Sequence, residues 1–284
     1  MTIALSFQCQ GGVVLAADSQ ITKEGGLKYN EKKIFDFWYR DFGAVMCYAG
    51  SPDIMNLVCE RMDREVFHSF VGESVVPGPP TSEWNTLMRA KLKDVLKNIF
   101  KEHGSKHEIE LLCALYNKEE GISVFRARGA VVSLAEPAEC LGVGDSSVLR
   151  FLSDLFLSEE MTIQQGLVLA CYMVAKAKTY IAGCGGPTQA VFVTHNGKMR
   201  NLNDIFSEGF SPEDELPYVQ RAIKSLMYAA CGRGTPLQVE NLNVAKFLRS
   251  ANLLGELKRA LSEVNWLSEI EAMHPGYFDG SDKS

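Results

Sequence analysis

Hydrophobic positions change their spacing along the chain, and the changes separate strand-like from helix-like stretches. Short apolar runs bounded by turn residues predict strands over 2–7, 13–17, 31–37 and 42–49. A polar loop is expected between the second and third of these, over 19–30. The same strand pattern returns over 108–116, 122–128, 131–134 and 189–195. Tight turns between the first four runs indicate antiparallel pairing.

Helical spacing of apolar residues alternates with these strand runs. It predicts helices over 51–66, 84–103, 148–157 and 162–181. Ser51 is the expected N-cap of the first helix. Gly- and Pro-rich residues predict a surface loop over 71–82 and a break over 183–187.

Strands and helices are grouped rather than alternating one by one, which predicts an α+β layered fold. Two sheets packed face to face, with a helix pair on each outer side, would bury these elements over residues 1–196. From about residue 197 the strand pattern stops. Residues 197–284 are therefore expected to form a mostly helical C-terminal extension.

Composition and charge narrow the function classes. With 29 Lys plus Arg against 35 Asp plus Glu, the net charge of −6 makes nucleic acid or an anionic membrane a poor partner. No apolar run reaches the roughly 18 residues of a membrane helix, and the start lacks signal-peptide features. Eight cysteines without a CxxC pair indicate reduced, buried thiols. We therefore expect a cytoplasmic protein.

The first residues carry the most informative chemistry. Thr2 follows Met1, and removal of Met1 would place a hydroxyl and a free α-amine on the same residue. An α-amine titrates near pH 8 and can act as the base for its own threonine nucleophile. A Met-Thr start is common, so this feature gains weight only from the residues that follow it.

Four segments follow one another in an order that matters: Thr2, then GGVVLAADS over 11–19, then Lys32-Lys33-Ile34, then Tyr48-Ala49-Gly50-Ser51. This order resembles the β-subunits of the proteasome and the bacterial HslV peptidase, which are N-terminal nucleophile hydrolases. The resemblance is collinear over about the first 65 residues and looser to about 195. It implies a four-layer αββα sandwich and a cofactor-free, threonine-type peptidase acting on polypeptides. It also implies a homo-oligomeric ring. An ATPase activator is compatible with the resemblance, although no residue of this sequence indicates one.

The resemblance assigns roles to individual residues. Thr2 Oγ would be the nucleophile, and Lys33 would stabilise its deprotonated form. Asp18 would pair with Lys33, and the backbone N–H of Gly50 would bind the developing oxyanion. Taken singly, Lys33 also fits an edge-strand lysine, Asp18 a turn cap and Gly50 a strand end.

Two departures from the family pattern leave alternatives open. Asp145 stands where active members place a serine, and the turn over 178–186 contains no acid. Asp145 could still accept a hydrogen bond from the α-amine. The alternatives are a catalytically inactive structural relative that only assembles, or a small-amide hydrolase with the same nucleophile. A Cys184 thiol nucleophile and a metal site at His103 and His107 are weaker hypotheses, because no paired His is evident and Gly104 interrupts the helix.

Overall fold

The computed structural model describes residues 2–23, 26–38, 41–67, 83–104, 109–142 and 160–202. The chain divides into two compact units, Met1–Asp214 and Glu215–Ser284, and every described residue belongs to the first. The predicted helix over 148–157 and most of the predicted extension over 197–284 lie outside the described residues.

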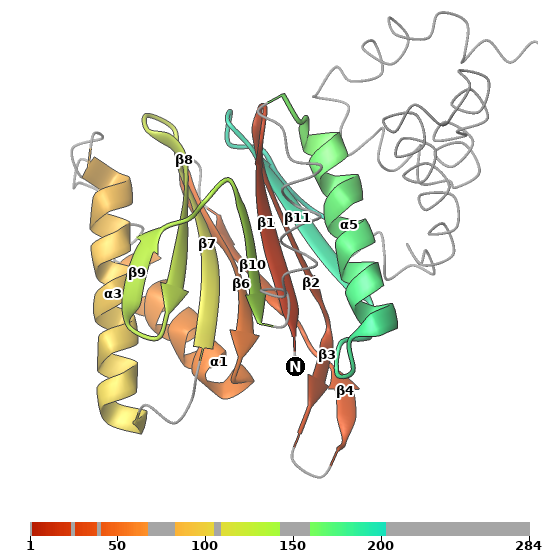
Figure 1. Ribbon diagram of the computed structural model, residues 1–284. Coiled ribbons are helices and arrows are strands. Elements are labelled where there is room, and N and C mark those ends of the chain that lie inside the picture. Colours follow the sequence, from red (N-terminus) through yellow and green to blue (C-terminus); the bar gives the residue numbers. More distant parts are fainter. Residues whose placement is uncertain are drawn as a thin grey trace, which may run out of the picture. The chain divides into compact units, whose positions relative to one another are not determined.

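One antiparallel sheet is built around the two strands that begin the chain (Figure 1). Its strands are β1 (Ile3–Cys9), β2 (Gly12–Asp18), β10 (Ala138–Gly142), β11 (Thr188–Thr194) and β12 (Met199–Asn201). They lie in the order β10-β1-β2-β11-β12. The β1–β2 hairpin pairs Ala4 with Ala17, so the start of β1 lies beside the end of β2.

The second sheet is a meander in which each strand pairs with the next along the chain. Its strands are β5 (Ile34–Trp38), β6 (Phe42–Gly50), β7 (Ile109–Asn117), β8 (Gly121–Arg128) and β9 (Val131–Leu134). A separate two-stranded ribbon joins the sheets, formed by β3 (Gln20–Thr22) and β4 (Lys28–Asn30).

The two sheets pack face to face through alternate residues of their strands. Val13, Leu15 and Ala17 of β2 share one buried cluster with Val45 and Cys47 of β6. Because successive strand residues point to opposite faces, the intervening residues of β2 face the other way. All seven residues of β2 are buried. This strand is therefore covered on both faces, which explains its continuous apolar run.

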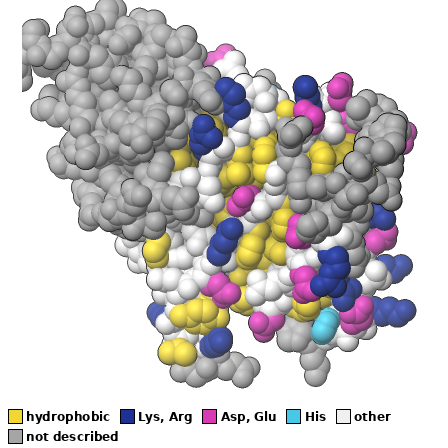
Figure 2. All heavy atoms as spheres, turned by 180° about the vertical axis from the view of Figure 1, so that it is seen from behind, with side chains coloured by type: hydrophobic (Ala, Val, Ile, Leu, Met, Phe, Trp, Pro, Cys, Tyr) yellow, Lys and Arg dark blue, Asp and Glu magenta, His cyan; other side chains and the backbone are white. Residues whose placement is uncertain are grey.

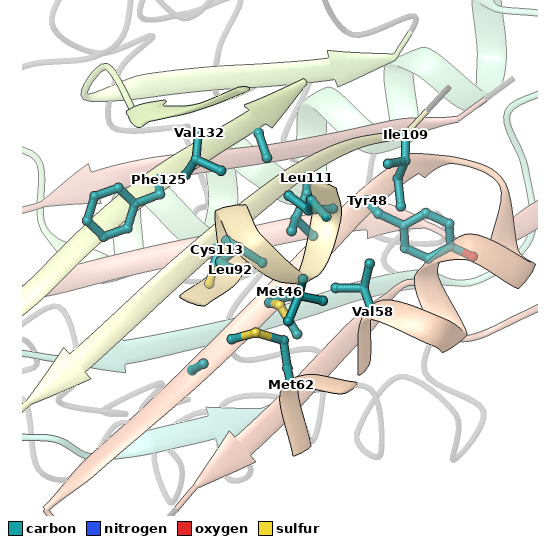
Figure 3. Close-up of a cluster of buried hydrophobic side chains, with 14 of the residues drawn as sticks. Met46, Tyr48, Val58, Met62, Leu92, Ile109, Leu111, Cys113, Phe125 and Val132 are labelled. Atoms are coloured by element: carbon teal, nitrogen blue, oxygen red, sulfur yellow. The ribbon is translucent and has the colours of Figure 1, made fainter. Parts of the chain in front are cut away.

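Helices cover the outer faces of the two sheets (Figure 1). On the second sheet lie α1 (Pro52–Arg61), the π-helical turn η1 (Met62–Phe67) and α3 (Trp84–His103). On the first sheet lies α5 (Ile163–Tyr180), which contacts β1, β2 and β11. Figure 3 shows how Val58 of α1 and Leu92 of α3 meet side chains of β6 and β7. None of the helices in the described ranges is long and apolar enough to cross a membrane.

Local sequence signals set where two of these helices begin. The Ser51 hydroxyl accepts a hydrogen bond from the Ile54 N–H, with Pro52 at the first helical position, which confirms the predicted cap. Thr162 caps α5 in a reciprocal capping box with Gln165. The seven cysteines in the described residues are thiols outside any disulfide, and five of them are buried, in agreement with the sequence analysis.

The structure confirms the α+β class, with two antiparallel sheets between helices, and corrects several predicted boundaries. The expected loop over 19–30 contains β3 and β4, and β10 was not predicted. The sheet also continues past residue 197, because β12 pairs with β11. The missed strands have three to five residues that include polar or charged side chains, too few apolar positions to show a period. The predicted strand over 31–37 begins only at Ile34, so Lys33 precedes it.

Candidate active site

The β1–β2 hairpin brings Thr2 and Asp18 together although 15 residues separate them. Thr2 directly precedes β1, and Asp18 ends β2. The Asp18 Oδ1 atom accepts a hydrogen bond from the Ile3 N–H at 3.1 Å. Its other oxygen, Oδ2, accepts one from the Gly185 N–H at 3.0 Å. The carboxylate is fully buried and is thereby held in one orientation beside Thr2.

Lys33 directly precedes β5 of the second sheet, and its side chain extends to Thr2 and Asp18 of the first sheet. Its Nζ donates hydrogen bonds to Asp18 Oδ1 at 2.7 Å, to Thr2 Oγ1 at 2.9 Å and to the Gln20 carbonyl at 2.6 Å. The Lys33 side chain is fully buried. Three acceptors match the three N–H groups of an ammonium, so the geometry suits the charged form. The structure therefore brings together Thr2, Asp18 and Lys33.

The electrostatics of this cluster follow from burial. Loss of water lowers the pKa of the Lys33 ammonium below that of a lysine in solution. The charge of Asp18 and its hydrogen bond act in the opposite direction and offset part of this effect. Lys33 therefore gives up its proton more easily than an exposed lysine while it still presents positive charge to the Thr2 oxygen.

Gly50 lies on a segment that adjoins Thr2. It ends β6 with a φ of +123°, a conformation that favours glycine. Its neighbour Ala49 approaches Thr2 across Gly142, which pairs with Ile3. A Cβ atom added to Gly142 would clash with the Thr2 carbonyl oxygen and would lie 2.9 Å from the Ala49 Cβ. Asp145, the remaining predicted site residue, lies outside the described residues.

This close approach predicts that Gly142→Ala displaces Thr2. Gly142 has a φ of +66°, and Gly121 has a similar φ of +76° but open space around its missing Cβ. Gly121→Ala is the matched control, because both variants carry the cost of about 1–2 kcal/mol for a left-handed residue. We expect Gly142→Ala to cost more in urea unfolding, because only its Cβ meets the Thr2 backbone. Equal unfolding midpoints for the two variants would contradict the close approach.

Cys184 lies in the turn after α5, next to Gly185. The pKa of its thiol is raised to about 11, mainly by burial and to a smaller extent by the negative charge of Asp18. The positive charge of Lys33 lowers this pKa and offsets part of the increase. A thiol that stays protonated at neutral pH is a poor nucleophile. This environment argues against the hypothesis that Cys184 is the attacking group.

A labelling experiment tests this conclusion. Alkylation of Cys184 at pH 7.5 should be about a hundredfold slower in the folded chain than in the urea-unfolded chain, where the pKa returns to about 9.0. The folded-state rate should rise with pH up to about 11 as the thiolate forms. Peptide mapping by mass spectrometry reports Cys184 separately. Equal folded and unfolded rates at pH 7.5 would mean that the thiol is activated.

A family model described as "Proteasome subunit" matches residues 2–185, which is more than half of the chain and includes Thr2, Asp18, Lys33 and Gly50. The chain belongs to the proteasome subunit family. The resemblance predicted from the first 65 residues is thus confirmed at the level of the family.

Solved structures share the proteasome-subunit fold at low sequence identity. A Gly-1 mutant of Anbu from Hyphomicrobium sp. strain MC1 matches with a TM-score of 0.65 and 13% identity, covering 83% of this chain and 98% of that one. Anbu from Yersinia bercovieri, described as an ancestral beta-subunit, matches with a TM-score of 0.65 and 12% identity, covering 82% and 97%. At these identities the likeness shows the fold alone. No curated protein matches the chain.

Three contributors to the cluster were not predicted from the sequence. The Gln20 carbonyl and the Gly185 N–H act through main-chain atoms, which all residue types except proline offer in full, so no residue pattern marks them. The third is the side chain of Gln189, which binds the backbone of Lys33 at 2.7 Å. A lone glutamine in a strand has no distinctive spacing, so only the fold reveals its partner.

The metal hypothesis finds no support in the described part of the chain. No group of three or more His, Cys, Asp and Glu residues there could hold a metal ion. His103 ends α3, and His107 lies outside the described residues.

Proposed function

We propose that this proteasome-family chain is a threonine-type peptidase whose nucleophile is Thr2, exposed as the first residue when Met1 is removed. The observation that carries the proposal is the buried hydrogen bond from Lys33 Nζ to Thr2 Oγ1, with Asp18 paired to the same ammonium. On an exposed surface, water would screen the charge of the lysine, and the same hydrogen bond would do little to stabilise a negative threonine oxygen. Placing the ion pair out of water strengthens its effect on the oxygen that would become negative.

The reaction is an acyl transfer followed by hydrolysis. The α-amine of Thr2 accepts the hydroxyl proton, directly or through water, while Oγ bonds to the peptide carbonyl carbon. The carbonyl oxygen becomes an oxyanion, to which the Gly50 N–H donates. The C–N bond then breaks, and the leaving amine takes the proton back from the α-amine. Water finally attacks the ester, which releases the acid and restores Thr2.

The residues expected to support the α-amine depart from the family pattern. In the turn over 178–186 no carboxylate is available, so Asp145 would have to support the amine. That substitution favours one second candidate, a catalytically silent subunit that only assembles. Retention of Met1 would accompany the silent state, because the blocked nitrogen could not act as a base.

Assembly is expected in either case, since proteasome-type subunits form oligomeric rings. Hydrophobic side chains gather in a band on the described surface seen from behind, flanked by charged side chains (Figure 2). Such bands mark contact surfaces between proteins. We propose a homo-oligomeric ring with polypeptide substrates. The predicted cytoplasmic location, ATPase activator and two-domain division stay predictions.

Trapping tests the proposed function. Intact-mass measurement of the native chain should show loss of Met1, and a threonine-directed electrophile should then add its mass to the peptide that begins with Thr2. Turnover of a fluorogenic peptide panel, but not of small amides, would identify a peptidase. Retained Met1 with no adduct would overturn the proposal in favour of the silent subunit.

A further inference from the structure

The segment that carries Lys33 has no strand partner of its own. Residues 31–33 lie between β4 and β5 and belong to neither. The Glu31 N–H donates to the Ser19 carbonyl at 2.8 Å, but Lys33 begins no ladder. A long lysine side chain on an irregular backbone has many rotamers, so its end is placed only if the backbone is held. Something other than a β-sheet must therefore fix residue 33.

Gln189 does this with a single side-chain amide. Its Oε1 accepts hydrogen bonds from the Lys33 N–H at 2.7 Å and the Ile34 N–H at 3.2 Å. Its Nε2 donates to the Glu31 carbonyl at 2.8 Å. The amide thus binds both sides of Lys33 and replaces the missing strand. Both ends of the amide are used, so a group with only acceptors or only donors cannot substitute fully.

The position of Gln189 links this amide to the rest of the cluster. Gln189 lies on β11 opposite Ala17 of β2, and its neighbour Thr188 lies opposite Asp18. The same region of the first sheet therefore presents Asp18 to the Lys33 ammonium and Gln189 to the Lys33 backbone. Both ends of Lys33, its backbone and its Nζ, are held by one pair of adjacent strands.

We infer that Gln189 is a positioning residue, which sets where the Lys33 ammonium lies relative to Thr2 by clamping the backbone on both sides of Lys33. The inference rests on the proposed function for its catalytic consequence, but the clamp itself is a separate property of the fold. Misplacing a catalytic group by about 1 Å can cost roughly a hundredfold in rate.

Three variants of the full chain separate this role from a general effect on folding. Gln189→Met keeps the length and removes all three hydrogen bonds. Gln189→Glu keeps the acceptors but sets a carboxylate oxygen against the Glu31 carbonyl. The matched control is Gln8→Met, because Gln8 also binds main-chain carbonyls, those of Ala135 and Glu136, but from the far end of β1.

Two readouts are measured on each variant. The first is amide hydrogen exchange of Lys33 and Ile34, which needs no activity. The second is the rate at which the electrophile modifies Thr2 across pH. Gln189→Met should speed exchange at both amides and slow modification by about tenfold to a hundredfold. The alkaline limb of its rate profile, where the Lys33 ammonium is lost, should move to higher pH, because water entering the loosened site relieves the burial that lowers the Lys33 pKa.

The other two variants test whether the effect comes from the hydrogen bonds of Gln189. Gln189→Glu should recover part of the protection from exchange, whereas Gln8→Met should match the parent chain in both readouts. Unchanged exchange at Lys33 and Ile34 in Gln189→Met would overturn the clamp. Faster exchange with an unchanged pH profile would overturn the positioning role. If the parent chain never reacts at Thr2, the proposed function fails, and exchange alone still decides whether Gln189 holds Lys33.

Discussion

Replacing Thr2 with alanine is expected to reduce peptide hydrolysis by roughly 10³ to 10⁶, down to the background rate. The proposed mechanism forms a covalent ester on Thr2 Oγ, and alanine has no atom that can replace it. The α-amine, Lys33 and Gly50 would all remain, so the loss would report the nucleophile alone. Turnover of a fluorogenic peptide and formation of the electrophile adduct are the two measurements.

A matched control distinguishes this loss from damage to the fold. Thr194→Ala removes the same atoms from another buried threonine, at the end of β11 that pairs with Gly12. It should leave the rate within about threefold of the parent, since Thr194 lies at the opposite end of β11 from Thr188, which pairs with Asp18. Thr2→Ser, which keeps a hydroxyl, should still form the adduct. Hydrolysis that survives Thr2→Ala undiminished would assign the activity to another group.

The second large effect is expected from Lys33→Met, which should lower both stability and activity. The variant leaves the buried Asp18 carboxylate with the Ile3 and Gly185 N–H groups but without its cation. Breaking a buried ion pair by removing one partner costs about 3–5 kcal/mol. We expect this loss in urea unfolding, together with loss of electrophile modification at Thr2.

Two further variants separate stability from chemistry. Lys33→Met combined with Asp18→Asn removes the buried charge, so it should regain part of the stability but none of the reactivity. The control Lys118→Met breaks an exposed pair with Asp41, whose side chains are 68% and 66% accessible. It should change stability by no more than about 0.5 kcal/mol. Equal unfolding of Lys33→Met and Lys118→Met would show that the buried pair contributes nothing.

The contrast between Lys33 and Gln189 shows how far sequence reasoning reaches in this chain. Lys33 could be singled out because it follows Thr2 and Asp18 in a recognisable order, and the structure places its Nζ within hydrogen-bond distance of both. Gln189 lies 156 residues further along the chain and carries no pattern. Its contact with the Lys33 backbone arises only when β11 packs against the start of β5.

The same distinction applies to the elements of the fold. The long elements with clear periods, such as β6 and α3, were predicted nearly to their ends. The short strands β3, β4, β10 and β12 were not, because each mixes polar or charged residues into three to five positions and pairs only where a neighbour is supplied, whereas the equally short β9 is marked by its adjacent valines. Gly142 ends β10, so its contact with Thr2 could not be predicted from the sequence either.

By itself, the order of apolar and polar residues determined the α+β class and the main strands and helices, while the family resemblance of four ordered segments selected the residues worth testing. Those properties are local, since burial of a strand or helix face is written into the spacing of its own residues. The tertiary structure alone decided that one ammonium meets a hydroxyl, a carboxylate and a carbonyl, and that a distant amide holds its backbone. Hydrogen bonds between segments depend on distances that no single segment specifies, so they exist only once both sheets have packed.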